Sequence, residues 1–289
     1  MYKTLHTDLT DSILTVTINR PDKLNAINKD VMKELGEVVT EIYENKDIRS
    51  AIITGAGPKA FVAGADIAEF LGLTKEQGQA LSAKGHDIYF RIASCPKPIA
   101  AAINGFALGG GLELAMACHF RLCTPNAKFG QPEVNLGLIP GYGGTQRLVQ
   151  LIGKGRAIEI MLSARMVEAT EAHVMGLVNY IVEEPDELLS KTRELLSIIN
   201  GKAPVAIARI IECANIAAGD GVFYGSSAVW AADPFGGQSA GEMRTDDGAL
   251  VRNGFLREQE AFGECFGTED MKEGARAFLE KRKPVFKGA

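Results

Sequence analysis

The sequence predicts an α/β protein, and three features support this fold class. Apolar runs typical of strands alternate with amphipathic helical segments as far as Val182. Glycine-rich turns separate several of these strands from the helices that follow them. Beyond Val182 the pattern is helical only, which predicts a mixed domain over residues 1–184 and a helical region over residues 185–289.

Composition sets the first limits on function. With 289 residues, 46% of them hydrophobic, the chain can bury a core for one large domain with a smaller appendage. A net charge of −5 without a long Lys/Arg block argues against a nucleic-acid groove. The five cysteines are odd in number and lack metal-ligand spacing, which predicts reduced thiols. Since the N-terminal residues do not resemble a signal peptide and no apolar run could span a membrane, we expect a soluble, cytoplasmic protein with no membrane partner.

The first elements follow from local periodicity. Ile13–Ile18 alternates apolar residues with Thr, a pattern typical of a half-buried strand. Ser50–Thr54 is predicted to be a second strand. Between them, Asn28 is expected to cap a helix with one apolar face, formed by Val31, Leu35, Val38, Val39 and Ile42.

A glycine-rich turn at Gly55–Ala60 nominally matches the dinucleotide-binding fingerprint. That fingerprint must open a helix, yet Phe61–Asp66 follows with another glycine, and no acidic residue closes a second strand about twenty residues further on. The sequence therefore does not favour an NAD-dependent dehydrogenase. The small residues of Phe61–Asp66 instead allow a ligand to pack against the backbone, and a helical region is expected to follow as far as Ala93.

The most informative stretch runs from Pro98 to Ala117. The apolar run Pro98–Ile103 predicts a fully buried strand, which is followed by a turn, by the glycines Gly109–Gly111 and by a buried helix over Leu112–Cys118. The first N–H groups of a helix have no partner within it, and the helix dipole favours negative charge there. The combination of strand, glycine turn and helix start therefore predicts an anion site.

Glu113 is the only charged residue between Lys97 and His119. Burying an unpaired carboxylate is unfavourable, so this residue should have a partner, a raised pKa or a chemical role. Two interpretations are open. Glu113 could cap the first helical turn, or it could act as a general acid or base beside an N–H group that binds an oxyanion.

A second candidate acid lies in the long loop Phe129–Thr145, which is rich in Gly and Pro. Ordered loops of this kind often carry function, and the loop contains a single acid, Glu133. On residue type alone, a solvated carboxylate is the simpler interpretation.

The remaining elements are predicted around this loop. Short strands are expected before it, at Phe120–Cys123 and Lys128-Phe129, and one more strand after it, at Leu177–Val182. Helices are expected over residues 145–152, 156–163, 187–199, 204–217 and 268–281.

Six segments together resemble the crotonase (enoyl-CoA hydratase/isomerase) superfamily, and they occur in the order found in that family. They are Asn19–Ala26, Phe61–Asp66, Asn104–Glu113, Phe129–Glu133, Ile139–Arg147 and Phe278–Phe286. The resemblance covers nearly the whole chain. It implies a spiral of strand–strand–helix repeats followed by a helical C-terminal region used for trimerisation, with trimers commonly paired into hexamers.

The resemblance also implies a reaction. In this family two backbone N–H groups hold the oxygen of a thioester enolate, and by resemblance the donors are Ala65 and Gly110. Hydratases of the family carry two glutamates, which match Glu113 and Glu133; the first would deprotonate the attacking water and the second would deliver a proton to the α-carbon. The expected activity is the reversible hydration of a trans-2-enoyl-CoA in fatty acid or related acyl-CoA metabolism. An isomerase that acts on a 3-enoyl-CoA is the alternative, because some isomerases keep both glutamates.

Residues that bind the acyl-CoA substrate are implied in the same way. They are Ala63, Asp66, Ile67, Ala68, Gly141, Phe278 and Lys281. The first four would line the coenzyme A channel, and Phe278 and Lys281 would approach the nucleotide end, in the same or a neighbouring subunit. Lys281 could equally be a solvated helix end. No metal or redox cofactor is implied, because coenzyme A is carried by the substrate.

One segment departs from the family pattern. Residues 223–252, which contain the only tryptophan, separate Gly221-Val222 from Asn253–Glu258, although these would normally be nearly adjacent. A surface extension is the simpler interpretation, since long insertions cost little closure entropy. The alternative is a lid or a subunit contact near the acyl pocket, because Trp and Phe side chains are unfavourable in water.

A function of another class is RNA binding, which is reported for relatives of this family. The acidic balance of the chain and the lack of a basic stripe argue against it. The leading prediction is therefore a hydratase whose partners are its acyl-CoA substrate and further copies of the same chain, as a homotrimer or homohexamer.

Overall fold

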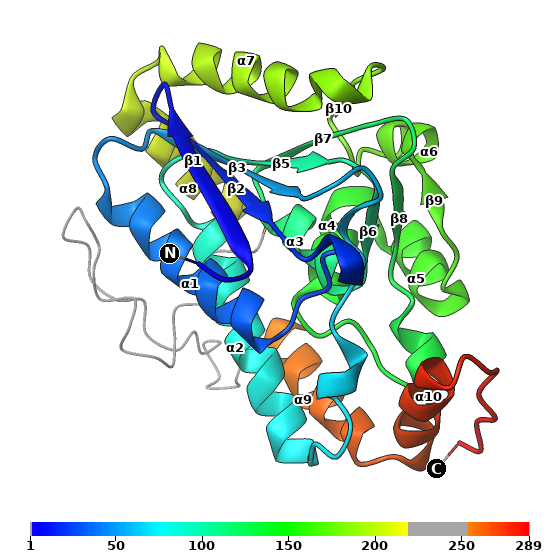
Figure 1. Cartoon of the computed structure of the whole chain (residues 1–289). Coiled ribbons are helices and arrows are strands. Elements are labelled where there is room, and N and C mark those ends of the chain that lie inside the picture. Colours follow the sequence, from blue (N-terminus) through cyan, green and yellow to red (C-terminus); the bar gives the residue numbers. More distant parts are fainter. Residues whose placement is uncertain (1, 219–253, 289) are drawn as a thin grey trace.

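The computed structural model describes residues 2–218 and 254–288, and their arrangement is shown in Figure 1. The segment 223–252, for which a surface extension and a lid were both considered, lies outside the described residues. The described part contains two β-sheets with helices packed around them.

The larger sheet has six strands in the order β1-β2-β3-β5-β7-β10. The first pair is antiparallel and the other neighbours are parallel. The strands are β1 (Leu5–Thr10), β2 (Ile13–Ile18), β3 (Ser50–Gly55), β5 (Ile99–Ile103), β7 (Phe120–Cys123) and β10 (Tyr180–Ile181).

The smaller sheet has the order β4-β6-β8-β9, in which β4 (Ala60–Val62), β6 (Phe106–Leu108) and β8 (Lys128–Gly130) are parallel and β9 (Val167–Glu168) is antiparallel. Along the chain, each of β3, β5 and β7 is followed by one strand of this smaller sheet and then by a helix. This succession is the strand–strand–helix repeat that was expected.

The helices that follow or cover these strands are α1 (Lys29–Glu44), α2 (Lys75–Ala93), α3 (Gly110–Ala117), α4 (Gly144–Ile152), α5 (Lys154–Ser163), α6 (Ala169–Val174), α7 (Leu188–Asn200), α8 (Pro204–Ala218), α9 (Gly254–Phe266) and α10 (Glu269–Leu279). At the start of α1, the side chain of Asn28 accepts the N–H of Val31 at 2.9 Å, which confirms the predicted cap. All five apolar residues predicted on one face of this helix are buried.

Both faces of the larger sheet are covered. Ile52 and Ala100 pack in the cluster that includes Leu188 and Leu196 of α7, the helix that lies across the sheet in Figure 1. Neighbouring positions such as Ile53 belong to the main core with α1, α2 and α3. Because β5 is buried on both sides, the run Pro98–Ile103 is apolar throughout rather than alternating.

The C-terminal helices reach back to the first half of the chain. α9 packs along α2, and α10 packs against the short 3-10 helices Ile67–Glu69 and Glu133–Leu136. A small apolar cluster joins Phe70, Leu138, Phe262 and Met271 across these elements. Beyond Pro185 the described residues form helices only, while the division into domains at residue 184 stays a prediction.

Several elements differ from the sequence prediction. β1, β4, β6, β9, α6 and α9 were not predicted, and the strand expected over Leu177–Val182 is reduced to Tyr180–Ile181. The carbonyl of Leu177 instead accepts the Nε–H of Arg121, at 2.8 Å. β1 was missed because it is an edge strand with little apolar alternation; the left-handed turn at Asp11 (φ 51°) and Ser12 (φ 60°) pairs it with β2.

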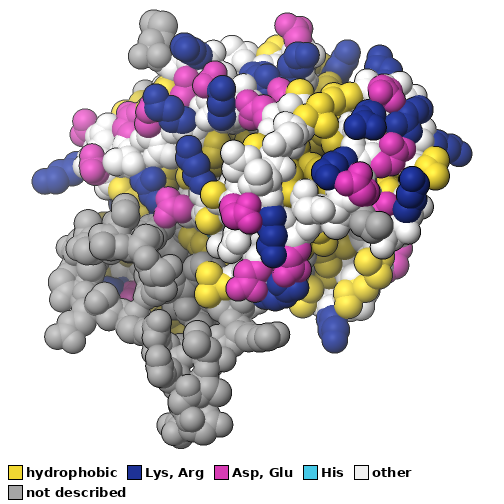
Figure 2. Space-filling model, turned by 90° about the horizontal axis from the view of Figure 1, so that it is seen from below, with side chains coloured by type: hydrophobic (Ala, Val, Ile, Leu, Met, Phe, Trp, Pro, Cys, Tyr) yellow, Lys and Arg dark blue, Asp and Glu magenta, His cyan; other side chains and the backbone are white. Residues whose placement is uncertain are grey.

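The surface carries both signs of charge. Over the described residues of the face shown in Figure 2, Lys and Arg side chains are interspersed with Asp and Glu. Among the helices that the structure describes, none has the length and apolarity needed to cross a membrane. The five cysteines, which all lie in the described ranges, are free thiols as predicted.

Candidate active site

Two glycine turns, one after β4 and one after β6, come together at one pocket. Gly64 (φ +108°) and Gly109 (φ +50°) adopt left-handed backbone angles that favour glycine. A Cβ atom on Gly109 would lie 3.8 Å from the Cα of Gly64, so the two turns are in van der Waals reach of each other. The side-chain hydroxyl of Tyr89 donates to the carbonyl of Gly110 at 2.9 Å, which fixes the start of α3.

The backbone N–H groups of Ala65 and Gly110 lie in these turns, and both residues line the pocket. Within the described residues, neither N–H donates to a protein acceptor, whereas the neighbouring N–H groups of Asp66 and Gly109 do, to Ile27 (2.8 Å) and Gly130 (2.9 Å). Gly110 is also the first residue of α3, where the helix dipole favours negative charge. The two free donors could therefore hold an oxygen that becomes negatively charged.

Glu113 projects from α3 into the same pocket and is 1% exposed. Its Oε1 accepts the N–H groups of Tyr142 and Gly144, both at 2.7 Å. Burial raises the pKa of Glu113 well above its ordinary value, the charges of Glu133 and Glu258 raise it further, and the two N–H groups oppose this. Since Gly144 is the first residue of α4, Glu113 caps the start of α4 rather than that of its own helix.

Glu133 begins the 3-10 helix Glu133–Leu136 and is only partly exposed, so it is not the fully solvated loop residue favoured by residue type alone. A Cβ atom on Gly109 would lie 2.8 Å from its Oε1, which places the carboxylate beside the second glycine turn. When the side-chain amide of Gln131 is oriented so that both its oxygen and its nitrogen have suitable partners, this buried amide donates to Oε1 (2.9 Å) and Oε2 (3.2 Å) of Glu133. Burial raises the pKa of Glu133 to about 8, and the charge of Glu258 contributes to the rise.

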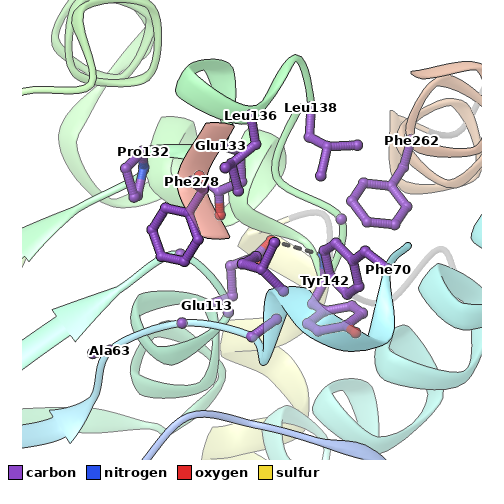
Figure 3. Close-up of a pocket in the computed structure, with 16 residues that line it drawn as sticks. Ala63, Phe70, Glu113, Pro132, Glu133, Leu136, Leu138, Tyr142, Phe262 and Phe278 are labelled. Atoms are coloured by element: carbon purple, nitrogen blue, oxygen red, sulfur yellow. Dashed lines mark hydrogen bonds between the residues drawn. The ribbon is translucent and has the colours of Figure 1, made fainter. Parts of the chain in front are cut away.

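The pocket has two ends with the glutamates between them. In Figure 3, Ala63, Pro132 and Phe278 lie toward one end. The other end is lined by apolar and aromatic side chains, labelled Phe70, Leu138, Tyr142 and Phe262. A ligand with an apolar tail and a long polar part could thus pass both carboxylates, with its tail among the aromatic rings.

Most of the residues selected from the sequence meet here. The pocket is lined by Ala63, Ala65, Ile67, Gly110, Glu113, Glu133, Gly141 and Phe278. Three others do not line it: Asp66 forms an ion pair with Arg20 (3.1 Å), Ala68 lies in the 3-10 helix beside it, and Lys281 is exposed just after α10. A role for these three in binding coenzyme A stays a prediction.

The sequence did not single out the apolar end of the pocket. Phe70, Leu136, Leu138 and Phe262 line it, and they come from three separate parts of the chain. Tyr142 was present only as a member of the segment Ile139–Arg147. No local pattern marks such residues, because each looks like an ordinary core side chain until the fold brings them together.

Known proteins of one family are similar to this chain over nearly its whole length. Residues 8–220 match the family described as Enoyl-CoA hydratase/isomerase. A short-chain-enoyl-CoA hydratase of Clostridium acetobutylicum is 42% identical over 271 residues, which cover 94% of this chain and 92% of that protein. A crotonyl-CoA hydratase of Syntrophomonas wolfei subsp. wolfei is 40% identical over 285 residues, with coverage of 99% and 98%. The crystal structure of an enoyl-CoA hydratase from Bacillus anthracis, 34% identical, superposes with a TM-score of 0.71 over 99% of this chain and 100% of that one.

Proposed function

The chain belongs to the enoyl-CoA hydratase/isomerase family, and we propose that it catalyses the reversible hydration of a trans-2-enoyl-CoA thioester to the 3-hydroxyacyl-CoA. Membership confirms the crotonase-like α/β fold expected from the sequence. One observation carries the proposed chemistry: the buried carboxylate of Glu113 and the partly buried carboxylate of Glu133 share a pocket with two backbone N–H groups that have no protein acceptor within the described residues.

The N–H groups of Ala65 and Gly110 are proposed to hold the thioester oxygen. When water adds to C3, the electrons of the C2–C3 double bond move toward the thioester, and its oxygen becomes negatively charged. Donors that are already in place stabilise this charge without reorganisation, and loss of one such donor typically costs about 3–4 kcal/mol. Backbone N–H groups suit this task because they do not titrate.

Glu113 and Glu133 are proposed to move the two protons. Glu113 takes a proton from water as the water oxygen bonds to C3, and Glu133 gives its proton to C2 as the enolate collapses. The substrate thus gains the atoms of one water molecule. The enzyme returns to its starting state when Glu113 releases its proton and Glu133 takes one up, directly or through solvent. A pKa of about 8 keeps Glu133 largely protonated at neutral pH, as the acid requires. The two N–H donors on Glu113 favour the charged form of that residue, as the base requires.

The two ends of the pocket orient the substrate. We place the acyl chain among Phe70, Tyr142 and Phe262, and the coenzyme A part toward Ala63 and Phe278. Phe70 and Phe262 pack edge to face at the apolar end, with ring centroids 6.2 Å apart, and we propose that this aromatic end takes a short acyl chain. The names of the two relatives, short-chain-enoyl-CoA hydratase and crotonyl-CoA hydratase, support the same choice.

Further properties belong to this proposal. The reaction needs no cofactor besides the coenzyme A carried by the substrate, because water supplies every atom that is added. We also propose that the chain assembles as a homotrimer or homohexamer. The buried free thiols of Cys95, Cys118 and Cys123 support a reducing, cytoplasmic location.

Turnover of crotonyl-CoA tests the proposed function. The purified chain should lower the enone absorbance of crotonyl-CoA as 3-hydroxybutyryl-CoA forms, and chromatography should show the product. A double-bond isomerase would leave this absorbance almost unchanged and would instead convert a 3-enoyl-CoA. Absence of hydration together with isomerisation would therefore contradict the proposal.

A further inference from the structure

Behind Glu113 lies another buried carboxylate, which the proposed reaction does not use. Glu258 is on α9, and its side chain is 0% exposed. A buried carboxylate is unfavourable unless its oxygens are hydrogen-bonded, so its partners indicate what it does.

The partners of Glu258 come from two other elements. Its Oε1 accepts the N–H of Gly143 (2.6 Å) and contacts Nε2 of His86 on α2 (3.1 Å). Its Oε2 accepts both the N–H (2.9 Å) and the side-chain hydroxyl of Thr145. Glu258 therefore ties α9 to α2 and to the start of α4.

The N–H groups of the segment Tyr142–Thr145 alternate between two carboxylates. The first and third donate to Glu113 in the pocket, and the second and fourth donate to Glu258 behind it. The segment is thus held from both sides. A shift of its outer anchor would move the two N–H groups that orient the Glu113 carboxylate.

The other charged and titratable groups around Glu258 are His86 and Arg147, and both are held in place by neighbouring side chains or backbone. Burial lowers the pKa of His86, so its ring is neutral at neutral pH and can donate from Nε2. Phe90 and Phe255 pack on this ring, each with a centroid distance of 5.8 Å. On α4, the Arg147 guanidinium lies 4.7 Å from the Phe90 ring centroid and donates to the carbonyl of Tyr142 at 3.2 Å.

We propose that Glu258 is a positioning residue for the hydration: it fixes the segment Tyr142–Thr145 and thereby holds the Glu113 carboxylate toward the substrate. This inference rests on the proposed function. Glu258 itself lines no part of the pocket, so it acts through the segment rather than on the substrate.

The charge of Glu258 gives the proposal a readout besides the rate. This charge raises the pKa of both Glu113 and Glu133. Removing it lowers both pKa values, so the acidic limb (deprotonation of the base) and the alkaline limb (loss of the proton from the acid) of the rate profile should both move to lower pH. Glu258→Asp keeps the charge but shortens the side chain, so it should lower kcat while leaving the position of the profile in place.

The experiment compares wild type, Glu258→Gln, Glu258→Asp and the control Glu260→Gln in crotonyl-CoA hydration from about pH 5 to 10. Glu260 is an exposed residue of the same helix, paired with Arg257, so its variant should behave as wild type. For Glu258→Gln we expect kcat to fall about 100-fold, the effect of a misplaced catalytic group, with KM changed much less and the profile moved to lower pH.

Two results would overturn the inference. The first is a folded Glu258→Gln variant, checked by near-UV circular dichroism, with the kcat and pH profile of wild type. The second applies if that variant does not fold: Thr145→Val, which removes one hydroxyl donor, is then measured instead, and an unchanged kcat would count against Glu258. A wild-type chain that does not hydrate crotonyl-CoA would contradict the proposed function, whereas hydrogen exchange of the Tyr142–Thr145 amides, faster in the Glu258 variants, still tests the anchor itself.

Discussion

Hydration requires one carboxyl group of the pocket to be charged while the other is protonated. Burial raises the pKa values of both Glu113 and Glu133, and the charge of each disfavours ionisation of the pair, so the two are expected to share one proton near neutral pH. Their donors differ, because Glu113 accepts the backbone N–H groups of Tyr142 and Gly144, whereas Glu133 accepts the side-chain amide of Gln131. The proposed roles place the charge on Glu113, where two fixed backbone donors favour it, and the proton on Glu133; the burial of Glu113 opposes this distribution.

Replacing either acid by its amide should abolish most of the activity. Glu113→Gln removes the base and Glu133→Gln removes the acid, and each should lower kcat by about 100- to 10,000-fold, the range of general acid–base catalysis. Because the side-chain shape is nearly unchanged, acyl-CoA should still bind, as measured by calorimetry with a substrate analogue. Wild-type turnover in either variant would remove that residue from the mechanism.

The raised pKa of Glu133 should also make the protein less stable at high pH. The pKa of Glu133 is about 8 in the folded chain, against an ordinary value of 4.5. Between pH 4.5 and about 8 the unfolded state has lost this proton while the folded state still holds it. The free energy of unfolding therefore falls as the pH rises through this window, and Glu133 does not change it outside the window. Glu133→Gln lacks this loss, so its Tm relative to wild type should increase from pH 5 to pH 9 in calorimetric scans. An equal Tm difference at both pH values would count against a raised pKa.

At the scale of elements, α3 has to approach β4 very closely to bring Gly110 and Glu113 to the pocket. A Cβ atom on Gly111 would lie 2.1 Å from the carbonyl oxygen of Val62 and 2.7 Å from its Cβ. Both contacts involve rigid parts of β4, so a larger residue at this position must push the helix away.

Gly111→Ala should therefore lower both stability and kcat, since the helix carries a proposed oxyanion donor and the proposed base. The Tm should fall, and crotonyl-CoA hydration should weaken even at temperatures where the variant is folded. Gly155→Ala on α5 is the matched control: no atom of the residues that the structure describes lies within 4 Å of its added Cβ, and alanine is the better helix former by about 0.5–1 kcal/mol. Equal behaviour of the two variants would show that the close approach of α3 and β4 is not required.

The sequence anticipated the parts of the site that depend on short segments. Gly110 and Glu113 share one glycine turn and helix start, and Glu133 lies in a Gly/Pro-rich loop, so local patterns could mark them. Phe262 and Glu258 could not be found in this way. They lie on α9, and the contact of Glu258 with His86 joins residues 172 positions apart, so only the packed fold brings them to the site.

The same distinction applies to the fold. Strands with long apolar runs, such as β3 and β5, were predicted because burial on both faces leaves a strong pattern. Of the two-residue strands, β9 was missed and β10 was predicted too long, since so short a segment carries no periodicity and is defined by its neighbours in the sheet.

At the scale of the whole molecule, α8 is an apolar helix without a buried residue. Ile210 is 69% exposed, Ile216 63% and Val205 59%, and these side chains point to more than one side of the helix. Apart from the exposed ion pair of Arg209 and Glu212, the helix is mostly apolar, and large exposed apolar surfaces on soluble proteins mark interaction sites. This helix is therefore the strongest candidate for a contact between subunits in the proposed trimer or hexamer.

Sedimentation equilibrium should give a mass of three or six chains of 31.0 kDa. Ile210→Lys places a charge in the proposed contact, where it would be buried without a partner, and should shift the mass toward that of a single chain. The control Leu9→Lys makes the same change on the edge strand β1, at a residue that is 42% exposed, and should leave the assembly intact. A wild-type chain that sediments as a monomer would contradict the proposed assembly, and an intact Ile210→Lys oligomer would move the contact away from α8. Phe278, at the proposed coenzyme A end of the pocket, belongs like α8 to the C-terminal part of the chain. A monomeric variant that also binds acyl-CoA more weakly would therefore indicate that neighbouring subunits help to complete that end of the site.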